Sequence, residues 1–280
     1  GSKDVDTIVN TIKLISGSFG GINLEDISAP RCFEIESRLK AELDIPVFHD
    51  DQHGTAVVMA AALINAAKVV KKELSSLRLV INGAGAAGIA IAKYLLEFGV
   101  NDIILCDRFG TIYKGAEGMN AAQAEMAEVT NKSGVKGTLA DAMKGADVFI
   151  GVSAPNCVSK DMVRSMAERA IVFSCANPVP EISREDALEA GAMVVGTGSS
   201  EKPNQINNVL VFPGLFRGTL DARVKDITFD MMKAASFGIA SCVGDKLSAD
   251  YILPYAYDKS AHESVAKAVY AEAVKSRQAK

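Results

Sequence analysis

Short runs of apolar residues alternate with longer segments of helical periodicity along most of the chain. RLVING (78–83) and DIILCD (102–107) read as strands, and GIAIAKYLLEF (88–98) between them has helical spacing. Further predicted strands are ADVFIGV (146–152), AIVFSCA (170–176), MVVGTG (193–198) and NVLVFPG (208–214), and predicted helices lie around 117–128, 160–167, 184–190 and 228–243. Apolar strands joined by helical crossovers require a parallel sheet covered on both faces. The pattern therefore predicts an α/β fold with a doubly wound parallel sheet.

The two ends of the chain fall outside this alternation. Residues 1–48 show no such repeat, and an alanine-rich amphipathic helix is expected at roughly 261–277. No apolar run reaches the length that we expect of a membrane-spanning helix. We predict one sheet domain with a short N-terminal segment before it and a C-terminal helix after it.

The composition narrows the functional classes. The 280 residues carry a formal net charge of −4, and their lysines and arginines form no cluster. This pattern argues against nucleic acid or an anionic membrane as the main partner, although single arginines can still bind a small anionic substrate. The five cysteines lie far apart and form no CxxC pair, which is typical of reduced thiols and favours a cytoplasmic location.

A glycine-rich stretch, GAGAAG, joins the first predicted strand to the helix after it. Gly83, Gly85 and Gly88 have the GxGxxG spacing, and the next predicted strand ends in Asp107. Gly83 permits the turn, Gly85 lets the backbone approach a pyrophosphate, and Gly88 lets helix and strand pack closely. Free N–H groups at the helix N-terminus would bind the phosphates, and Asp107 would accept hydrogen bonds from the ribose hydroxyls.

This context predicts a dinucleotide-binding site, against the alternative of a purely structural glycine turn. The acidic Asp107 repels a 2′-phosphate and favours NAD, whereas the neighbouring Arg108 could pair with that phosphate, so NADP stays open. The residues that we expect to contact the cofactor are Gly83, Ala84, Gly85, Ala86, Ala87, Gly88, Asp107, Arg108, Ser153 and Asn177.

Two acidic pairs form a second group of interest. Glu25 and Asp26 lie in NLEDI, and Asp50 and Asp51 lie in FHDDQHG. Clustered carboxylates suit a hard divalent cation such as Mg²⁺ or Mn²⁺. Spacing alone favours a simpler interpretation, in which the pairs are solvated surface and Asp51 caps a following helix.

Two histidines flank the second acidic pair and raise a zinc alternative. They are His49 and His53, which lie on either side of Asp50 and Asp51. Neither nearby cysteines nor an HExxH pattern supports zinc, so we expect these histidines to be structural.

Several motifs together resemble malic enzymes of the bacterial type. GGINLEDISAP, FHDDQHGTAVV, INGAGAAGIAIA, CDRFGTIYKG, CANP and NQINNVLVFPG occur in the order found in that family, from about Asp4 to the terminal helix. The resemblance implies a Rossmann-type NAD-binding domain over 54–280 and, over 1–53, a remnant of an N-terminal substrate domain. It also implies oxidative decarboxylation of malate to pyruvate and CO₂ with NAD or NADP and with Mg²⁺ or Mn²⁺.

The resemblance also assigns roles to single residues. Glu25, Asp26 and Asp51 resemble the metal ligands of the family, and Asp50 resembles the residue that orients its catalytic lysine. The asparagines that resemble contacts to malate and the nicotinamide are Asn177, Asn207 and Asn208. The simpler interpretation of these asparagines is that they are turn and loop residues.

The chain departs from the family in its acid and base. The family's catalytic tyrosine and lysine, and the arginine that holds malate, belong to an N-terminal domain that would precede residue 1 of this chain. We therefore expect a catalytically incomplete fragment of a protein that forms a homo-oligomer, such as a dimer, when complete. The alternatives are a non-catalytic nucleotide-binding module and another NAD-dependent dehydrogenase, such as an amino-acid dehydrogenase.

Overall fold

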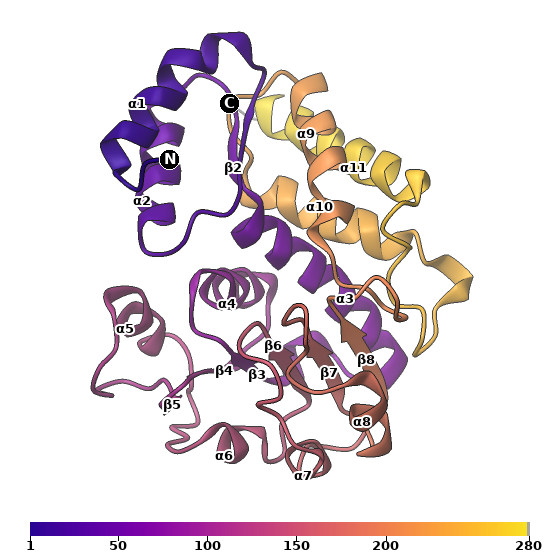
Figure 1. Ribbon diagram of the computed structural model, residues 1–280. Helices are drawn as coiled ribbons and strands as arrows, with labels where there is room; N and C mark the ends of the chain where they lie inside the picture. The colour runs from indigo at the N-terminus through magenta and orange to yellow at the C-terminus, as the bar shows by residue number, and fades with distance from the viewer. Residues whose placement is uncertain (279–280) are drawn as a thin grey trace.

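A six-stranded sheet forms the centre of the structure, a computed structural model that describes residues 1–278. The strand order is β5-β4-β3-β6-β7-β8 (Figure 1), and neighbouring strands are parallel except β4 and β5. The strands are β3 (Arg78–Asn82), β4 (Asp102–Asp107), β5 (Gly110–Thr111), β6 (Val148–Gly151), β7 (Ile171–Ser174) and β8 (Val194–Thr197). Five of the predicted strands are confirmed, and the short β5 was not predicted.

Strand β3 shows why these strands read as continuous apolar runs. Leu79 and Ile81 belong to the apolar core on one face of the sheet, and Val80 between them belongs to the core on the other face. Successive side chains of a strand point to opposite faces, so a strand buried on both sides needs apolar residues at every position. The predicted doubly wound α/β fold class is confirmed.

Helices cover both faces of the sheet (Figure 1). The larger core lies beneath α3 (Thr55–Val70), α4 (Ala86–Phe98), α9 (Phe212–Asp221), α10 (Phe229–Ser241) and α11 (Lys259–Gln278), with α5 (Ala121–Ala127) at its margin. The smaller core lies beneath α6 (Leu139–Met143), α7 (Lys160–Arg164) and α8 (Arg184–Glu189). The predicted C-terminal helix is α11, and it is part of the larger helical layer because Val265 and Val269 are buried there.

One predicted strand is wrong. The segment NVLVFPG (208–214) forms a 3₁₀ turn at Asn208–Leu210 and then the first turn of α9. A short apolar run fits a buried helix as well as a strand, and Pro213 fits the first helical turn, where no backbone N–H is needed. Gly214 explains the close packing of α9, because a Cβ there would lie 2.6 Å from the carbonyl oxygen of His262 in α11.

A second expectation, about membrane-spanning length, is also corrected. Among residues 1–278, the continuous helix Asp50–Val70 is long and apolar enough to span a membrane by length and composition alone. The sequence did not predict this length, because the polar residues Asp50–Gly54 were not expected to be helical and to continue into α3. Its 18-residue apolar window is 78% buried inside the protein, so these apolar residues form core contacts. Ala56 to Ala67 pack within the larger apolar core.

The N-terminal segment forms a small unit with its own core. It contains α1 (Val5–Ile15), β1 (Ile22–Leu24), α2 (Arg31–Glu42) and β2 (Val47–His49), and β1 pairs with β2 in parallel. Its core gathers Val9, Leu24, Ile35, Leu39, Leu43 and Val47. After β2 the chain makes one π-helical turn, Asp50–Gly54, and runs directly into α3. This turn joins the N-terminal unit to the sheet domain.

The strand order reverses direction between β3 and β6. From β3 the chain moves outward to β4 and β5, then returns to the other side of β3 and moves outward again through β6, β7 and β8. Open α/β sheets bind ligands at the carboxyl ends of the strands beside such a reversal. A ligand site is therefore expected where β3 and β6 end.

Candidate functional site

The glycine-rich turn lies at the carboxyl end of β3. Gly83 has φ +114°, and a Cβ there would lie 2.4 Å from the carbonyl oxygen of Val152. A Cβ on Gly88 would lie 1.9 Å from the carbonyl oxygen of Gly83, whereas a Cβ on Gly85 would meet no atom within 4 Å. Gly83 and Gly88 are therefore required by the fold itself. The open space at Gly85 supports its predicted role of leaving room for a pyrophosphate.

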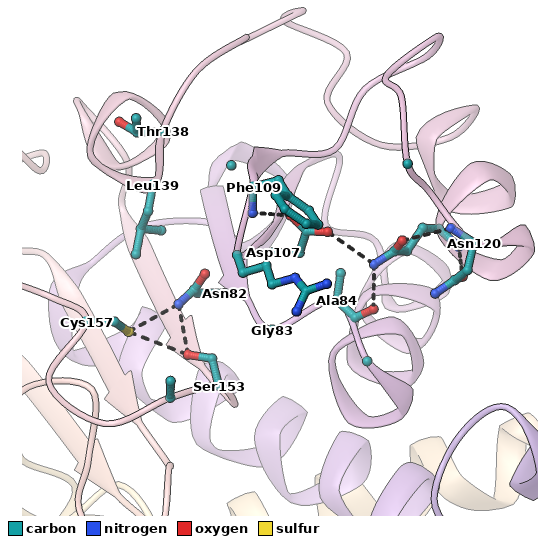
Figure 2. Close-up of a pocket in the computed structure, with 16 residues that line it drawn as sticks. Asn82, Gly83, Ala84, Asp107, Phe109, Asn120, Thr138, Leu139, Ser153 and Cys157 are labelled. Carbon is teal, nitrogen blue, oxygen red and sulfur yellow. Dashed lines mark hydrogen bonds between the residues drawn. The ribbon is translucent and has the colours of Figure 1, made fainter.

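A cleft of about 700 Å³ opens over this turn (Figure 2). We call it the cofactor cleft, and it extends from the end of β4, past the glycines, to the loop after β6. Its lining includes Asn82, Gly83, Ala84, Gly85, Asp107, Arg108, Phe109, Asn120, Gln123, Ser153 and Cys157. Ala86, Ala87 and Gly88 are the first residues of α4, whose N-terminus begins at the turn.

Asp107 is held at one end of the cofactor cleft. Its Oδ1 accepts a hydrogen bond of 2.7 Å from the backbone N–H of Phe109, and its Oδ2 lies 3.5 Å from Nε2 of Gln123. Gln123 also donates to the carbonyl oxygen of Ala84 at 3.2 Å. Gln123 was not predicted from the sequence, although its capping-box partner Asn120 marks the start of α5.

Arg108 lines the same end of the cleft as Asp107. Its guanidinium lies 4.6 Å from the centre of the Phe109 ring. A cation that stacks on an aromatic face keeps its charge available to a phosphate. The negative Asp107, which favours NAD, and the positive Arg108, which suits NADP, therefore lie side by side.

A smaller cavity of about 240 Å³ lies at the ends of β6, β7 and β8. We call it the small cavity. It brings Asp51, Asn177 and the pair Asn207–Asn208 together from distant parts of the sequence, and Val152 and Gly198 are among the other residues of its wall. Val152 immediately precedes Ser153, which lines the cofactor cleft. The two spaces are therefore neighbours along the loop that follows β6.

The asparagines of the small cavity are fixed by different contacts. Asn207 caps the 3₁₀ turn that follows it, because its Oδ1 accepts from the backbone N–H of Val209 at 2.9 Å. Asn208 donates from Nδ2 to Oδ2 of Asp50 at 3.0 Å. Asn177 packs against Gly198, where a Cβ would lie 2.8 Å from its Nδ2. Hydrogen bonds therefore hold Asn207 and Asn208, and all three asparagines lie in turns or loops.

The pairing of β1 with β2 brings the two acidic pairs together. Leu24 is opposite His49 in this parallel pair, so Glu25 and Asp26 leave the sheet beside Asp50 and Asp51. We call these four carboxylates the acidic edge. Oδ2 of Asp51 accepts from the backbone N–H of Asp26 at 2.8 Å, and Asp26 itself has φ +57°.

Asp50 is the buried member of the acidic edge, with 1% of its surface exposed. Burial, and then the negative charge of Glu25, raise the pKa of Asp50 to about 7. Its Oδ1 has no hydrogen-bond partner, and a Cβ on Gly54 would lie only 1.8 Å from it. The acidic edge is thus a crowded group of carboxylates in which one buried oxygen atom has no hydrogen-bond partner.

The carboxylates of the acidic edge are the right type of ligand for a divalent cation, but they are not arranged around one position. The acidic edge offers carboxylate oxygens, and Mg²⁺ and Mn²⁺ prefer such ligands. Within residues 1–278, however, no three His, Cys, Asp or Glu side chains converge around one point as ligands would. A bound cation would require these side chains to turn toward one another.

The two histidines have different surroundings. Nε2 of His53 lies 2.8 Å from Oε1 of Glu36, which also pairs with Lys40 at 2.6 Å. His49 is 1% exposed, and burial lowers its pKa and favours the neutral ring. His53 is therefore hydrogen-bonded to Glu36 of α2, which favours the structural role that we expected for it.

Comparison with known proteins gives a consistent result. The family described as "Malic enzyme, NAD binding domain" matches residues 52–274, and the one described as "Malic enzyme, N-terminal domain" matches residues 2–40. The bifunctional malic/malolactic enzyme of Bacillus subtilis is 57% identical over 96% of this chain, and the NAD-dependent malic enzyme of Geobacillus stearothermophilus is 53% identical over 96%. Other relatives are named as NADP-dependent malic enzymes.

A solved structure supports the same relationship. The NAD-dependent malic enzyme from Thermotoga maritima superposes with a TM-score of 0.93 and 43% identity, over 96% of this chain and 71% of its own. The chain spans 66% of the length of the Bacillus relative and 56% of the Geobacillus relative. These relatives therefore contain regions with no counterpart in the 280 residues.

Proposed function

The chain belongs to the malic enzyme family, and we propose that it is the part of a malate-oxidising, decarboxylating enzyme that binds the cofactor and the metal. Its larger part is the NAD(P)-binding domain of that family, with a Rossmann-type fold. The proposed overall reaction converts malate to pyruvate and CO₂ and reduces NAD or NADP. In this scheme 1–53 is the remnant of the N-terminal substrate domain and 54–280 is the cofactor domain.

One observation carries this proposal. Asp51 of the acidic edge shares the small cavity with Asn177, Asn207 and Asn208, and this cavity adjoins the cofactor cleft through Val152 and Ser153. A dinucleotide held at Asp107 and the glycine turn would extend past Ser153 toward this cavity. A substrate beside Asp51 would then lie next to the nicotinamide ring, as hydride transfer requires.

The acidic edge would hold the cation. We propose Glu25, Asp26 and Asp51 as its ligands, because they project from one edge and offer only oxygen donors. A bound Mg²⁺ or Mn²⁺ would stabilise the negative charge that develops on substrate oxygens during oxidation and loss of CO₂.

The residues around the cation would orient the substrate and a catalytic base. The amides of Asn177 and Asn207 face the small cavity, where they can donate to a substrate carboxylate. Asp50 would accept a hydrogen bond from the family's lysine, which lies outside these 280 residues. Its buried carboxylate, held by Asn208, offers that lysine a fixed partner.

The general acid and general base would come from residues outside this chain. We therefore propose that the 280 residues bind cofactor and metal but are catalytically incomplete. For the complete protein we propose a cytoplasmic homo-oligomer, such as a dimer, that acts on a small anion. The net charge of −4 and the absence of a basic cluster in the sequence support a small-molecule substrate over nucleic acid or a membrane.

The family match distinguishes this proposal from the alternatives. A purely structural Rossmann module would not need Asp51 and three asparagines around one cavity, and the relatives are named malic enzymes rather than amino-acid dehydrogenases.

The direct test is product analysis with a longer chain that includes the whole N-terminal domain. With malate, Mn²⁺ and NAD we expect equal amounts of NADH and pyruvate. Accumulation of oxaloacetate without pyruvate would show a non-decarboxylating dehydrogenase, and no NADH from any malate-containing mixture would refute the proposed activity. The Asp51→Asn variant of the same longer chain is the matched control, and we expect it to form neither product.

A further inference from the structure

Glu181 is a fully buried carboxylate that none of the sequence motifs indicated. It lies in the loop between β7 and α8 with 0% of its surface exposed, and within residues 1–278 it has no ion-pair partner. Burying a charge is strongly unfavourable unless hydrogen bonds replace the lost water. The hydrogen-bond partners of Glu181 therefore indicate why the protein keeps it.

Four donors from two strand ends point at Glu181. Its Oε1 accepts from the backbone N–H of Ser153 at 2.8 Å and from Oγ of Ser153 at 3.1 Å, beyond the end of β6. Its Oε2 accepts from Oγ of Ser174 at 3.0 Å and from the backbone N–H of Ala176 at 3.1 Å, at the end of β7. One carboxylate thus holds together the ends of two neighbouring strands.

The packing leaves no room for Glu181 to move away. A Cβ on Gly151, the last residue of β6, would lie 2.4 Å from the carboxyl carbon of Glu181. Oγ of Ser174 also accepts from the backbone N–H of Ile182 at 3.1 Å, which fixes the loop that carries Glu181. The carboxylate is therefore locked between β6 and β7.

The two strand ends that Glu181 holds belong to different walls of the site. Ser153 lines the cofactor cleft, and Ala176 precedes Asn177, which lines the small cavity. Asn82 donates from Nδ2 to Oγ of Ser153 at 2.8 Å (Figure 2), so this hydroxyl accepts from Asn82 and gives its own proton to Glu181. Ser153 consequently faces the cleft as an acceptor in a fixed orientation, with Sγ of Cys157 3.6 Å from its hydroxyl as a further neighbour.

From this arrangement we propose that Glu181 is the positioning residue for the nicotinamide half of the cofactor. It fixes Ser153, which would accept a hydrogen bond from that half, and it sets the distance between Ser153 and Asn177. The adenosine half would lie at Asp107 and the glycine turn, which Glu181 does not touch. The inference rests on the proposed binding of a nicotinamide dinucleotide in the cofactor cleft.

The test compares NADH with ADP, which lacks the nicotinamide half. In Glu181→Gln one carboxylate oxygen becomes an amide N–H₂, which faces two donors instead of accepting from them. Loss of hydrogen bonds to a buried charge should raise the Kd for NADH about ten- to a hundredfold. The Kd for ADP should stay within about twofold, because its partners are unchanged. Titration of the 280-residue chain by fluorescence for NADH and by calorimetry for ADP gives both values.

Glu189→Gln is the matched control, because Glu189 is an exposed glutamate of α8 that pairs with Lys160. It should change neither Kd. Equal losses of NADH and ADP affinity in Glu181→Gln would show that Glu181 has only a structural role and would overturn the inference. Unchanged NADH binding in this variant would overturn it as well. If the parent chain binds NADH no more tightly than ADP, the proposed binding of a nicotinamide dinucleotide is wrong. This result comes from the parent chain and is therefore distinct from any result with the Glu181 variant.

A second variant keeps the inference testable if Glu181→Gln does not fold. Ser174→Ala removes one donor from Oε2 of Glu181 and leaves the carboxylate and the cleft lining in place. We expect it to weaken NADH binding about threefold to tenfold with ADP binding unchanged. Unchanged NADH binding by a folded Ser174→Ala would overturn the inference.

Discussion

The cofactor cleft and the acidic edge are neighbouring parts of one proposed site, yet they are built differently. The cleft depends mainly on backbone geometry: the turn at Gly83, the open face at Gly85 and the N-terminus of α4. These features form whenever the sheet domain folds. The cleft should therefore bind its ligand without help from other parts of the protein.

The acidic edge depends on side chains that repel one another. Glu25 and Asp51 approach the buried Asp50, and its pKa is raised first by burial and then by the negative charge of these neighbours. Oδ1 of Asp50 has no hydrogen-bond partner, and among residues 1–278 no three His, Cys, Asp or Glu side chains converge as metal ligands would. This edge should therefore depend on a cation and on residues from the N-terminal domain. Folding of the sheet domain is thus enough to form the cofactor cleft, whereas the acidic edge also needs a cation and further residues.

The strongest way to break this comparison is to fill the open face of the glycine turn. Gly85 has φ −94° and ψ −161°, which other residues adopt, so Gly85→Val should fold normally. Its side chain would occupy the space proposed for the pyrophosphate and should raise the Kd for NADH by about a hundredfold or more, roughly 3 kcal/mol. Fluorescence titration measures the loss, and circular dichroism checks the fold. Unchanged NADH binding would remove the cofactor assignment.

A substitution at Gly88, in contrast, should lower the stability of the fold rather than block the ligand. In Gly88→Ala the new methyl group would lie 1.9 Å from the carbonyl oxygen of Gly83, so the helix and strand must separate. We expect a loss of about 1–3 kcal/mol in the free energy of unfolding, as for other overpacked sites. Urea denaturation measures this loss, and Gly85→Ala is the control that should lose much less. Equal stabilities would show that Gly88 is not needed for close packing.

Two variants of the acidic edge separate a ligand from an orienting residue. Asp51→Asn removes a proposed ligand and should raise the Kd for Mn²⁺ about tenfold or more, roughly 1.4 kcal/mol. Asp50→Asn should change that Kd by only about threefold, because Asp50 is turned toward Asn208. Calorimetry with Mn²⁺ and malate present gives both values. Similar losses in the two variants would contradict the division of roles.

The smallest expected effect concerns the choice between NAD and NADP. Asp107→Ser removes the charge that repels a 2′-phosphate and leaves Arg108 in place, so the ratio of the two affinities should shift about threefold to tenfold toward NADP. Parallel titrations with NADH and NADPH measure this ratio. If the parent chain already prefers NADPH, Arg108 determines the preference and the expectation of NAD is wrong.

The sequence predicted local features better than distant contacts. Each strand, the glycine turn and Asp107 lie within short stretches of sequence, so hydrophobic periodicity and glycine spacing were enough to find them. The segment 208–214 failed because a short apolar run does not distinguish a strand from a buried helix. The strand β5 was missed because two residues carry no periodicity.

Residues that act across the fold were beyond the reach of sequence patterns. Glu181 meets Ser153 only because β6 and β7 are neighbours in the sheet. The contact between Asn208 and Asp50 joins the 3₁₀ turn before α9 to the π-helical turn after β2. The acidic pairs were found by their composition, but only the register of β1 with β2 explains why they share one edge.

The most direct test of the central claim is NADH formation by the purified 280-residue chain with saturating malate, Mn²⁺ and NAD. The account predicts a chain that binds NADH yet turns over at least about 10⁴-fold more slowly than a longer chain with the whole N-terminal domain, because an acid and a base are each worth about 10²–10⁴-fold. Adding that domain, on the same chain or as a separate polypeptide, should restore turnover. A rate near that of the longer chain would place the acid and base within these 280 residues and contradict the account.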